Sequence, residues 1–183
     1  MMTRMVQENK KTALRIMKAE FLQKIDPILR QIGFEKSVFS SHHFGKRGKD
    51  YTYTYINLEE PQVLELIYFN LLSDELRMAV FFNRISLDKS VGDVLEFSGM
   101  DGHSLLLMPV RATEQEIHRW VPIPFLKIPS SYKVTELSNL KSTEKSAFKT
   151  ISNLADDLSH FDIIRAEWND LHTPTHVKVE NLK

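Results

Sequence analysis

The sequence lacks cysteine, contains only six glycines among 183 residues, and carries no net formal charge. Without cysteine it can form no disulfide, no thiol nucleophile and no cysteine-ligated metal site, and the composition is compatible with the cytoplasmic location that we predict. So few glycines provide poorly for a loop that cradles a nucleotide phosphate. No apolar run approaches the ~20 residues that a membrane span needs, so we expect no membrane partner.

The composition is that of an ordinary folded protein. Hydrophobic residues make up 42% of the chain and charged residues 26%, values typical of globular domains rather than disordered segments. A chain of 183 residues can bury a core without help from a metal or a disulfide. We therefore predict a single domain that spans residues 1–183.

The clearest structural signal is a set of three strand-length segments at residues 51–56, 63–69 and 76–82. They are rich in β-branched and aromatic residues and are separated by short polar turns, the pattern of an antiparallel meander. Long amphipathic helices are predicted on either side of it, at residues 7–32 and after Ser142, from apolar residues spaced three and four apart.

Together these segments predict an α+β fold. The N-terminal and C-terminal helices pack on one face of an antiparallel sheet of about five strands. Pro27 cannot donate a backbone hydrogen bond, so it should kink the first helix. The residues expected in the core are Phe21, Ile25, Ile28, Phe69, Val80, Phe82, Phe148 and Ile151.

The charge is distributed unevenly along the chain. Residues 1–49 hold eleven Lys/Arg and four Asp/Glu, whereas residues 50–183 hold thirteen and twenty. An acidic surface after residue 50 could dock a basic protein. The carboxylates proposed for it are Asp74, Glu75, Asp156, Asp157 and Asp162. Two solvated faces that neutralise each other would give the same composition.

The alternative partner is nucleic acid. Tyr51, Tyr53 and Tyr55 share one face of a predicted strand because side chains alternate along it, and the preceding turn contains Lys46, Arg47 and Lys49. Aromatic and basic residues together can form a stacking platform for a single strand. The same tyrosines could equally pack beneath the helices with their hydroxyls at the rim.

No arrangement of residues predicts catalysis, a metal site or a cofactor. The seven histidines are scattered, and Pro174 interrupts the helix that His172 and His176 would need to share a metal ion. Asp156 and Asp157 are adjacent, so on a helix their side chains diverge by roughly 100° instead of converging on one substrate atom. We therefore expect a non-enzymatic protein.

The segment from Phe21 to Phe34 contains a Leu-x-x-x-Gly-Phe motif that begins at Leu29. It resembles the opening of a family of small, uncharacterised bacterial α+β domains of the immunity-protein type, over the first ~45 residues. The resemblance implies a helix that leads into a curved antiparallel sheet, and a protein that neutralises a cognate secreted toxin by binding it. This is the expected function, with nucleic-acid binding as the alternative.

Overall fold

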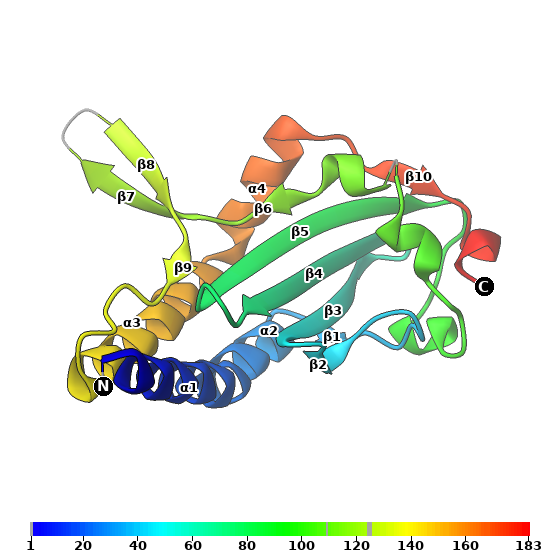
Figure 1. Cartoon of the computed structure of the whole chain (residues 1–183). Helices are drawn as coiled ribbons and strands as arrows, with labels where there is room; N and C mark the ends of the chain where they lie inside the picture. Colours follow the sequence, from blue (N-terminus) through cyan, green and yellow to red (C-terminus); the bar gives the residue numbers. More distant parts are fainter. Residues whose placement is uncertain (1, 109, 124–125) are drawn as a thin grey trace.

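The computed structural model describes residues 2–108, 110–123 and 126–183. Its centre is the predicted antiparallel meander, formed by β3 (Asp50–Glu60), β4 (Val63–Leu72) and β5 (Arg77–Leu87) (Figure 1). Tyr53, Phe69 and Val80 lie side by side across the three strands. Because paired residues point to the same face of a sheet, this register places the aromatic and aliphatic residues in one layer.

The sheet has eight strands, more than the expected five, and the class is α+β as predicted. The additional strands are only two to four residues long. They are β1 (Glu35–Lys36), β2 (Phe44–Arg47), β6 (Gln115–Glu116), β9 (Tyr132–Lys133) and β10 (Thr175–Val177). β1 and β2 pair with β3; β6, β9 and β10 pair with β5, and β10 is parallel to it.

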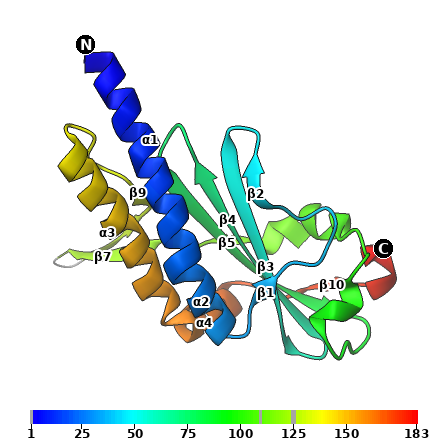
Figure 2. The same cartoon turned by 90° about the horizontal axis from the view of Figure 1, so that it is seen from below.

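The helices cover one face of the sheet, as predicted (Figure 2). They are α1 (Met2–Glu20), α2 (Asp26–Gln31), α3 (Leu140–Leu158) and α4 (Phe161–Leu171). A π-helical turn at Phe21–Ile25 joins α1 to α2, with the Asp26 N–H bonded to the Phe21 carbonyl. This wider turn directly precedes Pro27, so the irregularity expected at the proline takes the form of a π-turn.

The helix-covered face contains the larger core. Phe21, Ile25 and Trp168 are fully buried there, and the Phe21 and Phe69 rings meet edge to face at 5.0 Å. Of the expected core residues, Ile28 is only partly buried and Phe148 is 43% exposed. Phe148 lies one position off the inward stripe of α3, which instead runs through Ala147, Ile151, Leu154 and Leu158.

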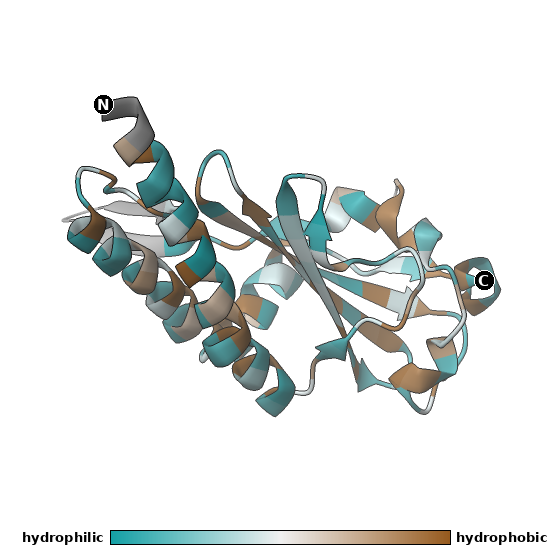
Figure 3. Cartoon of the chain, turned by 60° about the horizontal axis from the view of Figure 1, so that its bottom comes forward, coloured by the Kyte–Doolittle hydropathy of each residue, from teal (hydrophilic) through white to brown (hydrophobic). Residues whose placement is uncertain are grey.

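The opposite face of the sheet carries a second core, which is covered by short 3-10 turns and by the C-terminal segment. Leu64, Leu66 and Ile85 from the meander pack against Phe97 and Leu182. Hydrophobic residues accordingly occur along the meander strands, while hydrophilic residues are interspersed along the helices (Figure 3). Both faces of the strands are thus used for packing, which explains the nearly continuous apolar runs in the sequence.

A separate hairpin stands away from this body (Figure 1). Its strands are β7 (Arg119–Ile123) and β8 (Leu126–Ser130), and they pair with each other in a two-stranded sheet. Proline is tolerated here because each strand has an unpaired edge. Among the described residues, no helix is both long and apolar enough to cross a membrane.

Candidate functional site

A cavity of about 300 Å³, here called the groove, opens where β6 faces the junction of α3 and α4. β6 is short because only Gln115 and Glu116 pair with β5 before the chain leaves for the β7–β8 hairpin. The space beside α4 is therefore not filled by a further strand. The lining residues are Gln115, Glu116, Ile117, His118, Asp157, His160, Ile163, Ile164 and Glu167.

The turn between α3 and α4 fixes one wall of the groove. α3 ends at Leu158, and the Ser159 N–H bonds back to the carbonyl of Ala155 at 3.0 Å. His160 Nδ1 lies 3.0 Å from the carbonyl oxygen of Asp156, which holds the imidazole against the last turn of α3. α4 then begins at Phe161 and presents Ile163, Ile164 and Glu167 to the cavity.

Two carboxylates in the groove already have partners within the protein. Arg77 Nη1 lies 3.0 Å from Glu116 Oε1, and Arg119 Nη1 lies 3.3 Å from Asp157 Oδ1. The Tyr132 hydroxyl donates to Asp157 Oδ2 at 2.8 Å. Burial raises the pKa of Asp157 despite these contacts, because loss of water disfavours the charged carboxylate.

Other groups in the groove are not satisfied internally. Glu167 forms no ion pair within the part of the chain that the structure describes. The Oε1 atom of Gln115 is buried, yet no donor of the described residues reaches it. Ile163 is 53% exposed beside them. Buried acceptors normally have a hydrogen-bond donor, so the Gln115 side chain is unusual among the lining residues.

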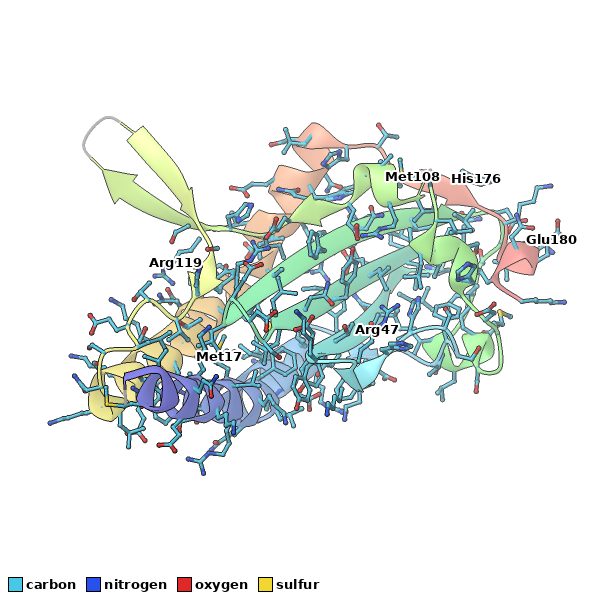
Figure 4. All side chains as sticks on the ribbon, in the orientation of Figure 1. Met17, Arg47, Met108, Arg119, His176 and Glu180 are labelled. Carbon is cyan, nitrogen blue, oxygen red and sulfur yellow. The ribbon has the colours of Figure 1, made fainter. Side chains whose placement is uncertain are left out.

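The acidic residues expected to bind a partner are divided between two places. Asp157 lines the groove. Asp156 also pairs with Arg119, whose Nη2 lies 3.1 Å from Asp156 Oδ2. The exposed Asp162 lies on the first turn of α4, which follows directly. Figure 4 places Arg119 near the base of the β7–β8 hairpin. The structure therefore brings these three carboxylates to one end of the molecule.

Asp74 and Glu75 lie instead in the turn between β4 and β5. Asp74 pairs with Lys49, and its carbonyl oxygen accepts a hydrogen bond from Lys10 of α1. Glu75 Oε2 lies 3.4 Å from Arg77 Nε, and Arg77 also contacts Glu116. Glu75 therefore reaches the rim of the groove through Arg77, whereas Asp74 belongs to the surface beside α1.

A second ionic cluster lies beside α4, on the helix-covered face of the sheet. Glu65 is fully buried and accepts two hydrogen bonds from Arg165, at 2.8 and 2.7 Å. Asn57 donates to Glu65 at 2.9 Å, and Arg84 lies 3.5 Å from it. Glu59 pairs with Arg84 and completes the cluster. Every charged group in this cluster has an opposite charge in contact, so it fixes α4 to the sheet.

The tyrosines of the nucleic-acid alternative face the helices. Tyr53 is 3% exposed and its ring stacks on Phe21 at 4.4 Å. Tyr55 is fully buried, and its hydroxyl donates to Asp26 Oδ1 at 2.7 Å. Tyr51 is partly buried, with Lys18 Nζ 4.0 Å from its ring centre. Tyr53 and Tyr55 therefore offer no open ring to a nucleic-acid base.

The basic turn remains at the surface and includes an aromatic residue that the sequence analysis missed. Lys46 and Arg47 are exposed and form no ion pair with other described residues, whereas Lys49 pairs with Asp74. Phe44 is 39% exposed, with Lys36 Nζ 4.3 Å from its ring centre. Figure 4 shows Arg47 well apart from Arg119. We call this surface the basic edge; it contains Lys18, Lys36, Phe44, Lys46, Arg47 and Tyr51.

One serine–histidine contact has the geometry of a nucleophile and its base. Ser37 Oγ lies 2.6 Å from His42 Nδ1. Burial lowers the pKa of His42 to about 4, an effect to which neighbouring His43 adds while Asp101 opposes it. His42 Nε2 is buried without a partner among the described residues, so no carboxylate orients the imidazole as a catalytic triad requires.

No group of three or more histidine, aspartate or glutamate residues within the described ranges is arranged to hold a metal ion. Comparison with models of protein families, with curated protein sequences and with solved structures gave no match. The groove and the basic edge both combine charged groups with exposed apolar or aromatic side chains, and a function can be argued from either.

Proposed function

We propose that this chain is a non-enzymatic binding protein that docks a basic protein in the groove, and that it neutralises a toxin in the manner of an immunity protein. The observation that carries the proposal is the groove itself, an open cavity that combines carboxylates with apolar walls. Interfaces of this kind bind through a desolvated centre and a charged rim.

The charge around the groove supports a basic partner. The groove and its rim carry six carboxylates and two guanidinium groups, a formal charge of −4; these are Glu75, Glu116, Asp156, Asp157, Asp162 and Glu167 with Arg77 and Arg119. A surface of one sign accelerates encounter with an oppositely charged protein. A basic nuclease domain is the kind of toxin that fits, because it must itself attract an anionic substrate.

The test begins with affinity capture from the native source and identification of the captured protein by mass spectrometry. That protein is then co-expressed with the chain in a host that it kills. The groove variant carries Glu167→Gln and Asp162→Asn. A matched control, Lys46→Gln with Arg47→Gln, changes two exposed charges on the basic edge.

We expect the wild type and the edge control to protect the host and the groove variant to protect it less, with slower association and weaker salt dependence. If cells that carry the wild-type chain die as fast as cells without it, the immunity function is wrong. If the groove variant protects fully, the docking surface lies elsewhere, and Asp74, in the turn between β4 and β5, is the next place to test.

The basic edge supports the second candidate, binding of a single-stranded nucleic acid. The observation that supports it is the position of two exposed cations, Lys46 and Arg47, beside the exposed Phe44; neither cation forms an ion pair with another described residue. Such binding should weaken steeply with salt, because phosphate contacts release counterions. Since Lys36 and Lys18 already cover the available rings, we expect no oligonucleotide binding at physiological salt. If an oligonucleotide binds with micromolar, salt-sensitive affinity and Phe44→Ala abolishes this binding, nucleic-acid binding replaces toxin binding as the preferred function.

A further inference from the structure

We propose that the groove is a receptor for a single arginine side chain, which anchors the partner. This inference rests on the proposed function, because it names the group of the basic partner that enters the cavity. Interfaces commonly concentrate their binding energy in one such anchor, and arginine is among the residues most often found in that role.

The walls of the groove fit the aliphatic part of the side chain. Ile117 and Ile164 are 6% and 8% exposed, and Ile163 at the mouth is 53% exposed. A flexible methylene stem that packs along these isoleucines removes apolar surface from water on both sides. A small inorganic cation would leave the same surface uncovered, so the apolar wall favours an organic cation.

The polar groups in the groove fit the guanidinium. Glu167 supplies a carboxylate that pairs with no described cation. Gln115 Oε1 is buried without a donor among the described residues, and it becomes a second acceptor when the side-chain amide turns towards the cavity. These two acceptors belong to different elements, α4 and β6. A planar group with five N–H donors can serve separated acceptors at once. An ammonium has three donors around one atom and is more strongly hydrated.

The histidines favour the same ligand. His118 and His160 both line the cavity, and His160 is held in place through its Nδ1 contact with the Asp156 carbonyl. A guanidinium stacks on flat rings through its own plane, which an ammonium cannot do. His118 Nε2 lies 3.8 Å from Glu116 Oε2, so one imidazole already contacts a carboxylate of the same cavity.

The arginines already at the rim show that its carboxylates accept guanidinium groups. Arg119 uses both terminal nitrogens, one on Asp156 at 3.1 Å and the other on Asp157 at 3.3 Å. Arg77 contacts Glu116 through Nη1 at 3.0 Å, and its Nε lies 3.4 Å from Glu75 Oε2. Neither of these two arginines pairs with Glu167. The partner's arginine therefore occupies a carboxylate that no guanidinium of the described residues uses.

The experiment uses the full chain and three short probes: acetyl-Gly-Arg-Gly-amide and the same peptide with lysine or citrulline in place of arginine. Each is titrated into ¹⁵N-labelled protein, and backbone amide shifts are followed by NMR. We expect weak, roughly millimolar binding of the arginine peptide, since one side chain supplies only part of an interface. The shifts should centre on Gln115, Ile163 and Glu167. The lysine peptide should bind several-fold more weakly, and neutral citrulline should not bind.

The variants Glu167→Gln and Asp170→Asn form a matched pair. Both residues lie on α4, but only Glu167 lines the groove. Each substitution removes one negative charge, so a long-range effect of net charge lowers both affinities equally. We expect about a fivefold to tenfold loss for Glu167→Gln, as for a lost charge-assisted hydrogen bond, and little change for Asp170→Asn. The unliganded spectrum of each variant confirms that the fold is unchanged.

The inference is overturned if the shifts lie outside the groove, if the three peptides bind alike, or if the two variants behave alike. These failures differ from failure of the proposed function. If the chain protects the host but does not bind the arginine peptide, the arginine site is wrong and the proposed function stands. If the chain binds the peptide but does not protect the host, the arginine site stands and the immunity role is wrong.

Discussion

The two ionic regions beside α4 use the same kinds of residue in opposite ways. In the cluster around Glu65, each charged group has an opposite charge in contact, and Glu65 accepts hydrogen bonds from Arg165 and Asn57. In the groove, Glu167 has no ion pair and Gln115 Oε1 has no donor within the described ranges. The difference separates charges that hold the fold together from charges that remain available for a partner.

The largest effect is expected at the cluster around Glu65. Glu65→Ala removes a fully buried carboxylate and leaves Arg84 and Arg165 as like charges with fewer partners. Breaking a buried pair from one side typically costs about 3–5 kcal/mol. Urea unfolding of the variant and the wild type measures the change in the free energy of unfolding. A loss below about 1 kcal/mol would show that the cluster is solvated and does not fix α4.

The buried His42 side chain should make the free energy of unfolding depend on pH, by an amount close to the loss expected for Glu65→Ala. Burial lowers the pKa of His42 to about 4, below the value of about 6.5 in an unfolded chain. Between these values only the unfolded state binds the proton, so the part of the stability that depends on His42 is fully present above about pH 6.5 and falls by roughly 3 kcal/mol towards pH 4. His42→Gln should remove this slope. Unfolding curves measured between pH 4 and 7 provide the test, and identical slopes would contradict it.

An exposed ion pair should contribute much less to stability than the buried cluster around Glu65. Lys49 and Asp74 contact each other, but their side chains are 67% and 72% exposed. Pairs in such positions contribute little to stability, because water screens them and both side chains lose freedom. A double-mutant cycle with Lys49→Ala and Asp74→Ala measures the coupling. A coupling energy near that of the Glu65 cluster would mean that exposure does not decide the role of a charge here.

The smallest effect on stability is expected at the groove itself. Glu167→Gln removes no ion pair with another described residue, so the free energy of unfolding should change by less than about 0.5 kcal/mol, as for ordinary surface substitutions. The same substitution should weaken binding of the arginine peptide. Chemical unfolding and the peptide titration on one protein sample separate the two effects. A large loss of stability would assign Glu167 to the fold instead of to binding.

The parts of the fold that follow a repeating pattern could be predicted from the sequence. The meander and the long helices show periods of two and of three to four residues, and they occur where expected. β2, β6, β9 and β10 were missed because strands of two to four residues are too short to show a period. Their pairing depends instead on residues far away in the sequence.

The site could be predicted only in part, for a related reason. Alternation places Tyr53 and Tyr55 on the same face of β3 but does not tell which face the helices cover, and both prove to be buried. Asp156 and Asp157 were recognisable as an acidic pair in a helix. Glu116 and Glu167 were not, because only the folded chain brings β6 and α4 together around one cavity.

The position of the C-terminal segment has a consequence for the order of folding during synthesis. α1 and the meander leave the ribosome first, whereas α3, α4 and the segment that contributes β10 and the buried Leu182 emerge last. Until residues 140–182 follow, each side of the sheet lacks part of its covering. A chain stalled before that point should expose apolar surface on both sides and depend on a chaperone to avoid aggregation.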